Sequence, residues 1–551
     1  MAKSVDRRTA LAILAGSLSA GVINPRATLG HPRRKVGKGV VSGHLQGAAV
    51  GQRIMEDGGN AVDGIVAAAL VAGVTDIGAC GPGGYGLHMT IAMVNRPVRV
   101  IDGNSTAPAA ARHDMFDTAP DGSAVKPYLP DSPTGRVNEV GWLSAGVPGT
   151  LGGLQLANDL FGTRSIGDLL APAIGLARGG FPLSEGTARS IRTRLELLRR
   201  DAGSAELLLV DGEPPSPGAI FRNPDLATML ESLADAGSLD GFYRGEIGRI
   251  IAGAFQDNGG LVTFDDMAAY QAQEVDPLVF EWMGQTVYTA PLTAGGATIL
   301  ETLSILRALD SSGGSLRSPR ARLESLRVAW KDRLDFFGDP EHTDVPLAKL
   351  LSAPYAEEMA GRVAAAMDRG RALPIETLSR EQDGTISLSA ADDEGNIAAL
   401  TLTHGAGFGA GVTVPGLGLI LGHGVSRFDP RPGHPNSPGP GKRPLHNMCP
   451  TIGARDGRPG LALGGRGGRR IPNAVFDVVA AVLTGKTVDE AMAAPRMHTD
   501  GNMHVTLEES WPEADVDAIR RMGYEVRTGP SATVSAAAID LDSGDLLTAL
   551  R

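Results

Sequence analysis

The sequence lacks features typical of three common protein classes. Its 551 residues include only two cysteines, Cys80 and Cys449, which excludes a disulfide framework and a cysteine zinc site, although spacing alone does not decide whether the two pair. No long basic run occurs and the net charge is −11, which argues against nucleic acid as a partner. Beyond the first thirty residues no apolar run approaches the roughly 20 residues of a membrane span. We therefore expect a soluble mature protein without a membrane span.

Glycine, by contrast, is abundant. The 74 glycines amount to roughly twice the usual share and follow no period, so the chain is neither collagen-like nor a linker. They indicate many tight turns and close backbone approaches. A chain of 551 residues is also too long for one simple core, so we expect at least two domains or one large layered domain.

The first thirty residues differ in composition from the rest. Arg7 and Arg8 precede a mildly apolar run over residues 9–23, which is too short to span a membrane. Adjacent arginines before a weakly apolar segment are typical of a twin-arginine export signal, which we assign to residues 1–30. The alternative is a cytoplasmic protein with a basic amphipathic leader. Export would place the mature protein in the periplasm.

The most informative stretch is a predicted hairpin. Residues 385–392 and 396–403 alternate as strands do, and the loop between them ends in Gly395, which suits a type I turn closed by a bulge. Pairing Asp392 with Asn396 sets Thr403 opposite Thr385, with Cβ atoms roughly 4.5–5.5 Å apart. On the first strand Ile386, Leu388 and Ala390 share one face, and Thr385, Ser387 and Ser389 share the other.

A threonine that starts a strand directly after Gly384, with a second hydroxyl beside it, has what an N-terminal nucleophile needs. Cleavage before Thr385 would free an α-amine that can act as base for the same residue's hydroxyl. The alternative is an ordinary threonine-rich hairpin, since strands are enriched in threonine.

Elsewhere the pattern predicts strands near both ends of the chain and helices between them. Helices are expected at 46–56, 61–74, 150–161, 165–179, 190–201 and 323–337, a strand at 87–94, and a long surface loop at 426–444. The glycine loop at 77–86 precedes a strand and lacks the lysine of a P-loop, so nucleotide binding is discounted. This order fits an α+β fold, a four-layer αββα sandwich with a largely helical middle region.

Eight segments, in order, resemble the γ-glutamyltranspeptidase family of N-terminal nucleophile hydrolases, from about residue 39 to the end. They are GGNAVD at 58–63, TAPA at 106–109, GVPGT at 146–150, TFDDMAAY at 263–270, YTAP at 288–291 with GG at 295–296, GDP at 338–340, GKRPL at 441–445 and PTI at 450–452. The resemblance implies an amidohydrolase or acyltransferase that needs no metal and no cofactor.

The resemblance also implies specific roles. The precursor would cut itself between Gly384 and Thr385, giving a large subunit, 31–384, and a small catalytic subunit, 385–551, that stay together as a heterodimer. Thr385 would attack an amide carbonyl and form an acyl-enzyme, which water or an amine then resolves. Thr403 matches the family's second threonine. Gly467 and Gly468 match its oxyanion-hole glycines, and consecutive backbone N–H groups in a glycine turn can point at one oxygen.

The sequence departs from the family at the pocket for a γ-glutamyl group. Asn104 replaces the arginine that usually binds the α-carboxylate, and Arg427 replaces the aspartate that usually binds the α-ammonium. Gly405 and His423 replace two asparagines, and His446 and Asn447 replace a pair of serines.

An ammonium group would be repelled by Arg427, which with His423, His446 and Arg466 would form a basic site. We therefore expect a small-molecule amide with an anionic acyl group that lacks an α-amine. The alternatives are a true γ-glutamyl hydrolase or transferase, surface solvation of these side chains, and an inactive periplasmic binding relic of the fold.

Overall fold

The structure is a computed structural model that describes residues 37–118, 125, 136–375, 377 and 385–551. The predicted export signal, including Arg7 and Arg8, and Gly384 of the predicted cleavage site lie outside these residues. Among the described residues, no helix combines the length and the apolar character needed to cross a membrane.

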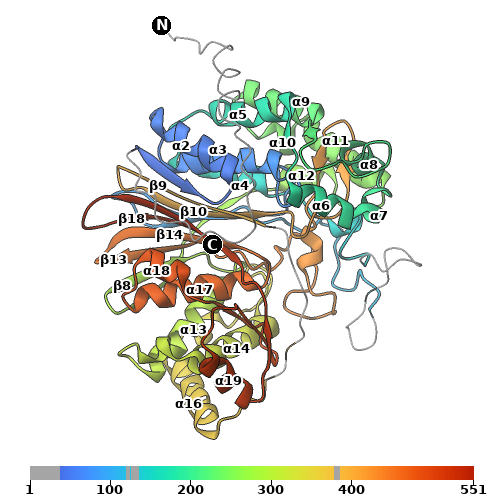
Figure 1. The fold of residues 1–551 in the computed structure, drawn as a ribbon. Helices are drawn as coiled ribbons and strands as arrows, with labels where there is room; N and C mark the ends of the chain where they lie inside the picture. Colours follow the sequence, from blue (N-terminus) through green and yellow to red (C-terminus); the bar gives the residue numbers. More distant parts are fainter. Residues whose placement is uncertain (1–36, 119–124, 126–135, 376, 378–384) are drawn as a thin grey trace.

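Two six-stranded sheets form the middle of the molecule (Figure 1). The strands within each sheet pair antiparallel. The first sheet runs β1 (Gly39–Ser42), β9 (Ile386–Asp392), β10 (Ile397–Thr403), β2 (Gly86–Ala92), β3 (Arg99–Asp102) and β6 (Gln273–Val275). The second runs β19 (Leu546–Leu550), β18 (Thr533–Ile539), β14 (Arg458–Arg466), β13 (Thr451–Arg455), β8 (Gln285–Thr289) and β7 (Leu278–Trp282).

Helices cover the outer face of each sheet. The first sheet is covered by α2 (Leu45–Glu56), α3 (Ala61–Thr75) and α4 (Thr150–Phe161), with α5 (Ile166–Gly179) and α9 (Pro224–Ala236) beyond them. The second is covered by α13 (Gly296–Leu309) and α17 (Arg470–Leu483), with α14 (Pro319–Phe336) and α16 (Ala353–Arg369) beyond them. This arrangement confirms the predicted four-layer αββα sandwich.

The described residues form further helices and strands besides these. They are the helices α6 (Glu185–Thr193), α7 (Leu195–Leu198), α8 (Ala202–Leu208), α10 (Gly241–Arg244), α11 (Glu246–Asp257), α12 (Phe264–Ala269), α15 (Leu347–Leu350), α18 (Val488–Ala493) and α19 (Glu513–Arg521), and the strands β4 (Phe181–Pro182), β5 (Ile220–Phe221), β11 (Thr413–Val414), β12 (Leu419–Ile420), β15 (Met497–His498), β16 (His504–Leu507) and β17 (Glu525–Thr528). Single 3₁₀ turns occur at Trp142–Ser144, Gly314–Arg317 and Gly424–Arg427.

Two predictions about local structure were wrong. The helix expected at 190–201 is divided into α6 and α7 by Arg194, and Asp201 caps α8 instead of ending the helix, since its carboxylate accepts from the Ser204 N–H at 2.8 Å. The loop expected at the surface over 426–444 is partly buried, with Lys442 and Arg443 each under 9% exposed. The Arg443 guanidinium pairs with Glu341 at 3.4 Å, and the Lys442 ammonium donates to the Pro435 carbonyl at 3.0 Å. An ion pair and a hydrogen bond therefore offset the cost of burying these polar side chains.

The position of the predicted hairpin is fixed by a carboxylate at its turn. Asp392 accepts from the N–H groups of Asn396 at 2.8 Å and Ala61 at 2.8 Å. Ala61 begins α3, where N–H groups lack partners within the helix, so one side chain joins the turn to a helix N-terminus. All fifteen residues of α3 are buried. A hydrogen bond therefore holds the hairpin turn against the N-terminus of α3, the most buried helix of the first outer layer.

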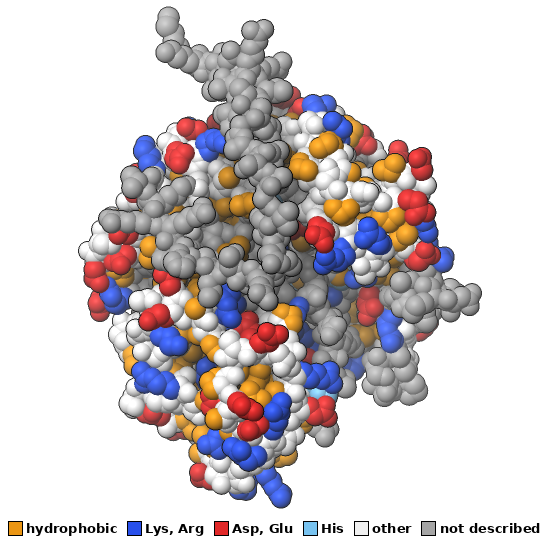
Figure 2. All heavy atoms as spheres, in the orientation of Figure 1, with side chains coloured by type: hydrophobic (Ala, Val, Ile, Leu, Met, Phe, Trp, Pro, Cys, Tyr) orange, Lys and Arg blue, Asp and Glu red, His pale blue; other side chains and the backbone are white. Residues whose placement is uncertain are grey.

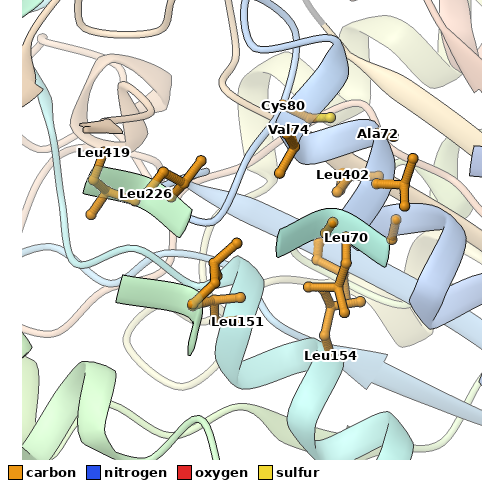
Figure 3. Close-up of a cluster of buried hydrophobic side chains, with 14 of the residues drawn as sticks. Leu70, Ala72, Val74, Cys80, Leu151, Leu154, Leu226, Leu402 and Leu419 are labelled. Carbon is orange, nitrogen blue, oxygen red and sulfur yellow. The ribbon is translucent and has the colours of Figure 1, made fainter. Parts of the chain in front are cut away.

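The two faces of the hairpin meet different surroundings. Leu402 of β10 belongs to the apolar cluster between the first sheet and its helices, with Leu70, Leu151 and Leu154 (Figure 3). On the opposite face Ser387 donates to or accepts from Ser535 of β18 at 2.9 Å. A Cβ added at Gly464 of β14 would lie 2.3 Å from the Ser387 hydroxyl oxygen. Small polar residues therefore let the two sheets approach closely beside the start of β9.

The surface carries both signs of charge. Figure 2 shows blue and red side chains interspersed over one face, with small separate groups of hydrophobic side chains between them.

Candidate active site

The hairpin brings Thr385 and Thr403 together in the predicted register. In the pairing of β9 with β10, Ile397 lies opposite Ala391 and Leu402 lies opposite Ile386. Continuing this register by one residue sets Thr403 opposite Thr385. Their hydroxyl oxygens are 3.1 Å apart. Thr385 is 8% exposed and Thr403 is 2% exposed. The two hydroxyls therefore form a buried pair at the end of the central strands of the first sheet.

The backbone around Thr403 orients its hydroxyl. The Thr403 hydroxyl oxygen accepts from the Gly405 N–H at 2.7 Å, and the Thr403 carbonyl accepts from the Tyr85 N–H at 3.1 Å. A hydroxyl that accepts one hydrogen bond from the backbone can also donate its own proton, here to the Thr385 oxygen. This arrangement can orient the Thr385 hydroxyl and polarise it.

Gly467 and Gly468 lie in the turn between β14 and α17. Their φ angles are +131° and +61°, in a region that side chains other than glycine rarely adopt. A Cβ at Gly467 would also approach the backbone of Ala532 to 3.1 Å. The turn leads into a helix of 14 residues, whose N-terminal end carries a partial positive charge that favours an anion nearby. Glycine is thus required here on conformational grounds.

A cavity of about 680 Å³ lies on the far side of Gly405 from the threonine pair, and neither threonine lines it. Gly405, whose N–H binds Thr403, is part of its wall. Its wall carries the guanidinium groups of Arg194, Arg333, Arg427, Arg431 and Arg469 and the carboxylates of Glu139, Asp335 and Asp429. Five positive groups against three negative ones make the described part of the wall basic, which favours an anionic ligand.

His423 lines this cavity with an uncharged ring. Burial, and then the positive charge of Arg427, hold the pKa of His423 well below its usual value, so the ring is neutral at pH 7. Its Nδ1 lies 2.9 Å from the Glu139 carbonyl; a carbonyl can only accept, so Nδ1 carries the proton. Nε2 is therefore an acceptor, placed against Gly405, where an added Cβ would meet it at 2.3 Å.

The other predicted pocket residues fall into two groups. Arg427 and Asn447 line the cavity with His423. His446 lies behind that wall, 2% exposed, with its ring centroid 4.4 Å from that of His88. Burial, followed by the nearby His88 and Arg333, holds the pKa of His446 well below its usual value. His446 therefore adds no positive charge to the wall at pH 7.

Asn104, predicted as a substrate-binding residue, and Arg466, predicted as part of the basic site, do not line the cavity. Asn104 is fully buried, and its amide donates to Thr293 at 2.6 Å and to the Pro444 carbonyl at 2.8 Å. Arg466 is exposed and lies beside a separate small pocket with His44 and Leu550. Both positions were inferred by matching the sequence to the family's motifs, which does not tell on which side of a strand or turn a side chain lies in this chain.

Four cavity arginines, Arg194, Arg333, Arg431 and Arg469, were missed by reasoning from the sequence. Arg469 follows the glycine turn directly, so its place in the run GGRGGRR was the one available signal. It pairs with Asp500 at 3.1 Å. Arg194 and Arg333 come from α6–α7 and α14 and reach the cavity only through the fold. No local pattern distinguishes them from surface arginines.

The two cysteines are free and buried. The pKa of the Cys80 thiol is well above its usual value, mainly because the thiol is buried. Burial also raises the pKa of the Cys449 thiol. Because the thiolate is the reactive form, neither cysteine competes with Thr385 as a nucleophile. The sequence left undecided whether Cys80 and Cys449 form a disulfide, and in this structure they do not.

Replacing Thr403 by valine, which keeps the shape but removes the hydroxyl, tests the threonine pair. The Gly405 N–H and the Thr385 hydroxyl would each lose a partner. Leaving buried groups unpaired costs about 1–3 kcal/mol, so we expect amide hydrolysis to slow between about 5-fold and 100-fold. Thr401→Val is the matched control, because the Thr401 hydroxyl oxygen is buried without a hydrogen bond among the described residues. Equal losses in the two variants would contradict a specific role for Thr403.

Comparison with known proteins agrees with this geometry. The family model described as gamma-glutamyltranspeptidase matches residues 47–550. The glutathione hydrolase proenzyme of Escherichia coli (strain K12) is 34% identical over 526 residues, which cover 89% of this chain and 88% of the relative. The acylase ACY 1 proenzyme of Pseudomonas sp. (strain SE83) is 33% identical over 496 residues, which cover 89% and 87% of the two chains.

The solved structures agree on the fold. The cephalosporin acylase from Bacillus halodurans superposes with a TM-score of 0.83 over 97% of both chains, at 23% identity, a likeness that shows the fold alone. The family match, in contrast, spans nearly the whole described chain, and both curated relatives are named as proenzymes. The chain belongs to the γ-glutamyltranspeptidase family of N-terminal nucleophile hydrolases.

Proposed function

We propose that this chain is a precursor that cuts itself before Thr385 and then uses Thr385 as an N-terminal nucleophile on an amide. The observation that carries the proposal is the buried pair of hydroxyls, with Thr385 at the start of β9 and 3.1 Å from Thr403. The names of the relatives, which are proenzymes of a hydrolase and an acylase, support both self-cleavage and amide chemistry.

In this mechanism each group has one task. The freed α-amine of Thr385 takes the proton of its own hydroxyl; an unperturbed α-amine has a pKa of about 7.7–8.0 and so is partly unprotonated near neutral pH. The hydroxyl oxygen attacks the amide carbonyl, and the proton passes to the leaving amine. Gly467 and Gly468 hold the oxyanion through their N–H groups. Water or an amine acceptor then attacks the acyl-enzyme and frees Thr385.

The acyl group of the substrate is proposed to be anionic and to lack an α-amine. The basic cavity wall supports an anion, and Arg427 repels an ammonium group. The neutral ring of His423 offers a hydrogen-bond acceptor but no negative charge to pair with an ammonium. The second candidate is a γ-glutamyl hydrolase or transferase acting on glutathione-like amides, which the name of the Escherichia coli relative favours. A relic without activity is the third.

The intact mass of the purified protein tests self-cleavage most directly. We expect two chains, one of which begins Thr-Ile-Ser-Leu at residue 385 and ends at 551, with 551 − 384 = 167 residues. An inactive relic has no reason to cut at Thr385, so self-cleavage would argue against that alternative. A wild-type protein that remains one chain yet hydrolyses amides would overturn the N-terminal nucleophile mechanism.

The two products, residues 31–384 and 385–551, should remain together as a heterodimer. Strands β9 and β10 lie between β1 and β2 in the first sheet, and β13 pairs with β8 in the second. Each sheet thus contains strands from both products. Separating them would expose strand edges in both sheets, so native size-exclusion chromatography should give one peak that contains both chains.

Export by the twin-arginine route is proposed from the sequence of residues 1–30. Changing both Arg7 and Arg8 to lysine should leave the precursor in the cytoplasm, because that route depends on the arginine pair. Fractionation of cells followed by immunoblotting measures the outcome. Unchanged export of the double variant would show that the arginines are only a generic basic start.

A further inference from the structure

Arg333, a residue of α14, is a buried cation on the cavity wall. It is 2% exposed and lines the cavity. Its Nη1 donates to the Ala294 carbonyl at 3.2 Å and its Nη2 to the His446 carbonyl at 2.5 Å. Both acceptors are uncharged. Within the described parts of the chain, no carboxylate forms an ion pair with Arg333, although burying a charge without a partner is costly.

The other deeply buried arginines differ from Arg333. Arg327 pairs with Glu324 at 3.4 Å. Arg496 has the cation Arg551 as its first charged neighbour, but the carboxylates of Glu508 and Asp477 also act on it. Neither arginine lines the cavity. For Arg333, burial, followed by the positive charge of Arg469, lowers the pKa to about 10. The guanidinium remains charged at pH 7 and has another cation, rather than an anion, as its charged neighbour.

The surroundings of Arg333 connect it to the threonine pair. Its guanidinium carbon is 5.9 Å from the ring centroid of Trp330, which Arg469 approaches to the same distance. The charges of Arg427 and Arg333 both act on the phenol of Tyr85, and the Tyr85 N–H binds the Thr403 carbonyl. Asn447, which follows the carbonyl that Arg333 binds, also lines the cavity. Arg333 and the threonine pair therefore have Tyr85 as a common neighbour.

We propose that Arg333 is the residue that anchors the anionic group of the acyl donor, through N–H groups that are not used by the Ala294 and His446 carbonyls. This inference rests on the proposed function and deepens it, because it assigns the counter-charge to a residue outside the family's usual pocket. Two of the five N–H donors of the guanidinium are used by carbonyls, so donors remain for a carboxylate. A carboxylate bound there would supply the charge partner that the described residues do not provide.

The experiment compares two anilides that differ only in the terminal group of the acyl chain. Glutaryl anilide ends in a carboxylate, and pentanoyl anilide carries a methyl group in its place. Arg333→Gln removes the positive charge but keeps N–H donors for the two carbonyls. We expect kcat/KM for glutaryl anilide to fall about 10- to 100-fold, mainly through KM, with the rate on pentanoyl anilide within about threefold of wild type. Arg333→Lys, which keeps the charge but loses the planar fork, should recover part of the loss.

Arg320→Gln is the matched control. Arg320 lies on the same helix as Arg333 but does not line the cavity, so its replacement should change the ratio of the two substrates less than threefold. Equal losses of kcat/KM on both anilides in Arg333→Gln would show a structural role only and would overturn the inference. No loss on either anilide would overturn it as well. If Arg333→Gln does not fold, the Arg333→Lys ratio decides: a value equal to that of wild type overturns the inference, and a reduced one supports it.

The proposed function and the inference fail in different ways. A wild-type protein that cuts itself before Thr385 and hydrolyses both anilides, with a ratio independent of Arg333, would leave the proposed function in place and remove the anchor alone. An uncut wild-type protein would remove the proposed function itself.

Discussion

A Thr385→Ala protein is expected to remain one uncut chain without amidase activity. The substitution removes the oxygen that both reactions require: attack on the preceding peptide bond in the precursor, and attack on the substrate in the mature enzyme. Loss of a nucleophile commonly costs several powers of ten in rate. Denaturing electrophoresis and intact mass measure the cutting, and release of aniline from an anilide measures the activity.

Two variants make the Thr385→Ala result specific. Thr385→Ser keeps a hydroxyl at the same position and should retain some cutting and some activity. Ser389→Ala removes a hydroxyl from the same face of β9, where it contacts Ser535 at 3.1 Å, and should cut and hydrolyse nearly as well as wild type. Complete self-cleavage of Thr385→Ala would mean that another group is the nucleophile and that the threonine pair has a structural role.

The hairpin could be predicted because its pattern has only one consistent register. Strand side chains alternate with a period of two, so a shift of one residue would turn Ile386 and Leu388 towards the polar interface between the sheets. The turn residues Asp393 to Gly395 fix the loop length, and Gly395 has a φ of +101° in the structure, as the predicted turn requires. Local rules therefore suffice to place Thr403 beside Thr385.

The cavity could not be predicted in the same way, because its wall comes from distant segments. Arg194, Arg333 and Arg469 lie on three different elements, and in the sequence each is one of many arginines. Asn104 was placed in the pocket because it matches the position of the family's arginine, yet its amide donates to Thr293 and to the Pro444 carbonyl. Long-range packing decides which polar side chains reach a cavity, and neither periodicity nor spacing contains that information.

Wild-type enzyme is expected to prefer a glutaryl anilide over a γ-glutamyl anilide. Binding a γ-glutamyl group takes one partner for its α-carboxylate and another for its α-ammonium. Asn104, at the first usual position, is uncharged and fully buried, and Arg427, at the second, has the wrong sign for an ammonium. Losing a charge-assisted contact costs about 1.5–3 kcal/mol, and roughly 1.4 kcal/mol is tenfold in rate. Two such losses lower kcat/KM for the γ-glutamyl substrate by about 10²-fold or more.

The charge of Arg427 gives this preference a direct test. Arg427→Asp replaces a cation on the cavity wall by an anion, which attracts the α-ammonium of the γ-glutamyl group and repels the carboxylate of the glutaryl group. The ratio of kcat/KM for the two anilides should therefore move towards the γ-glutamyl substrate, whereas Arg427→Gln, which only removes the charge, should move it part of the way. The neutral ring of His423 does not offset either change, because its pKa lies well below 7. A wild-type preference for the γ-glutamyl anilide would contradict the assignment of an amine-free acyl group and favour ordinary γ-glutamyl chemistry in this cavity.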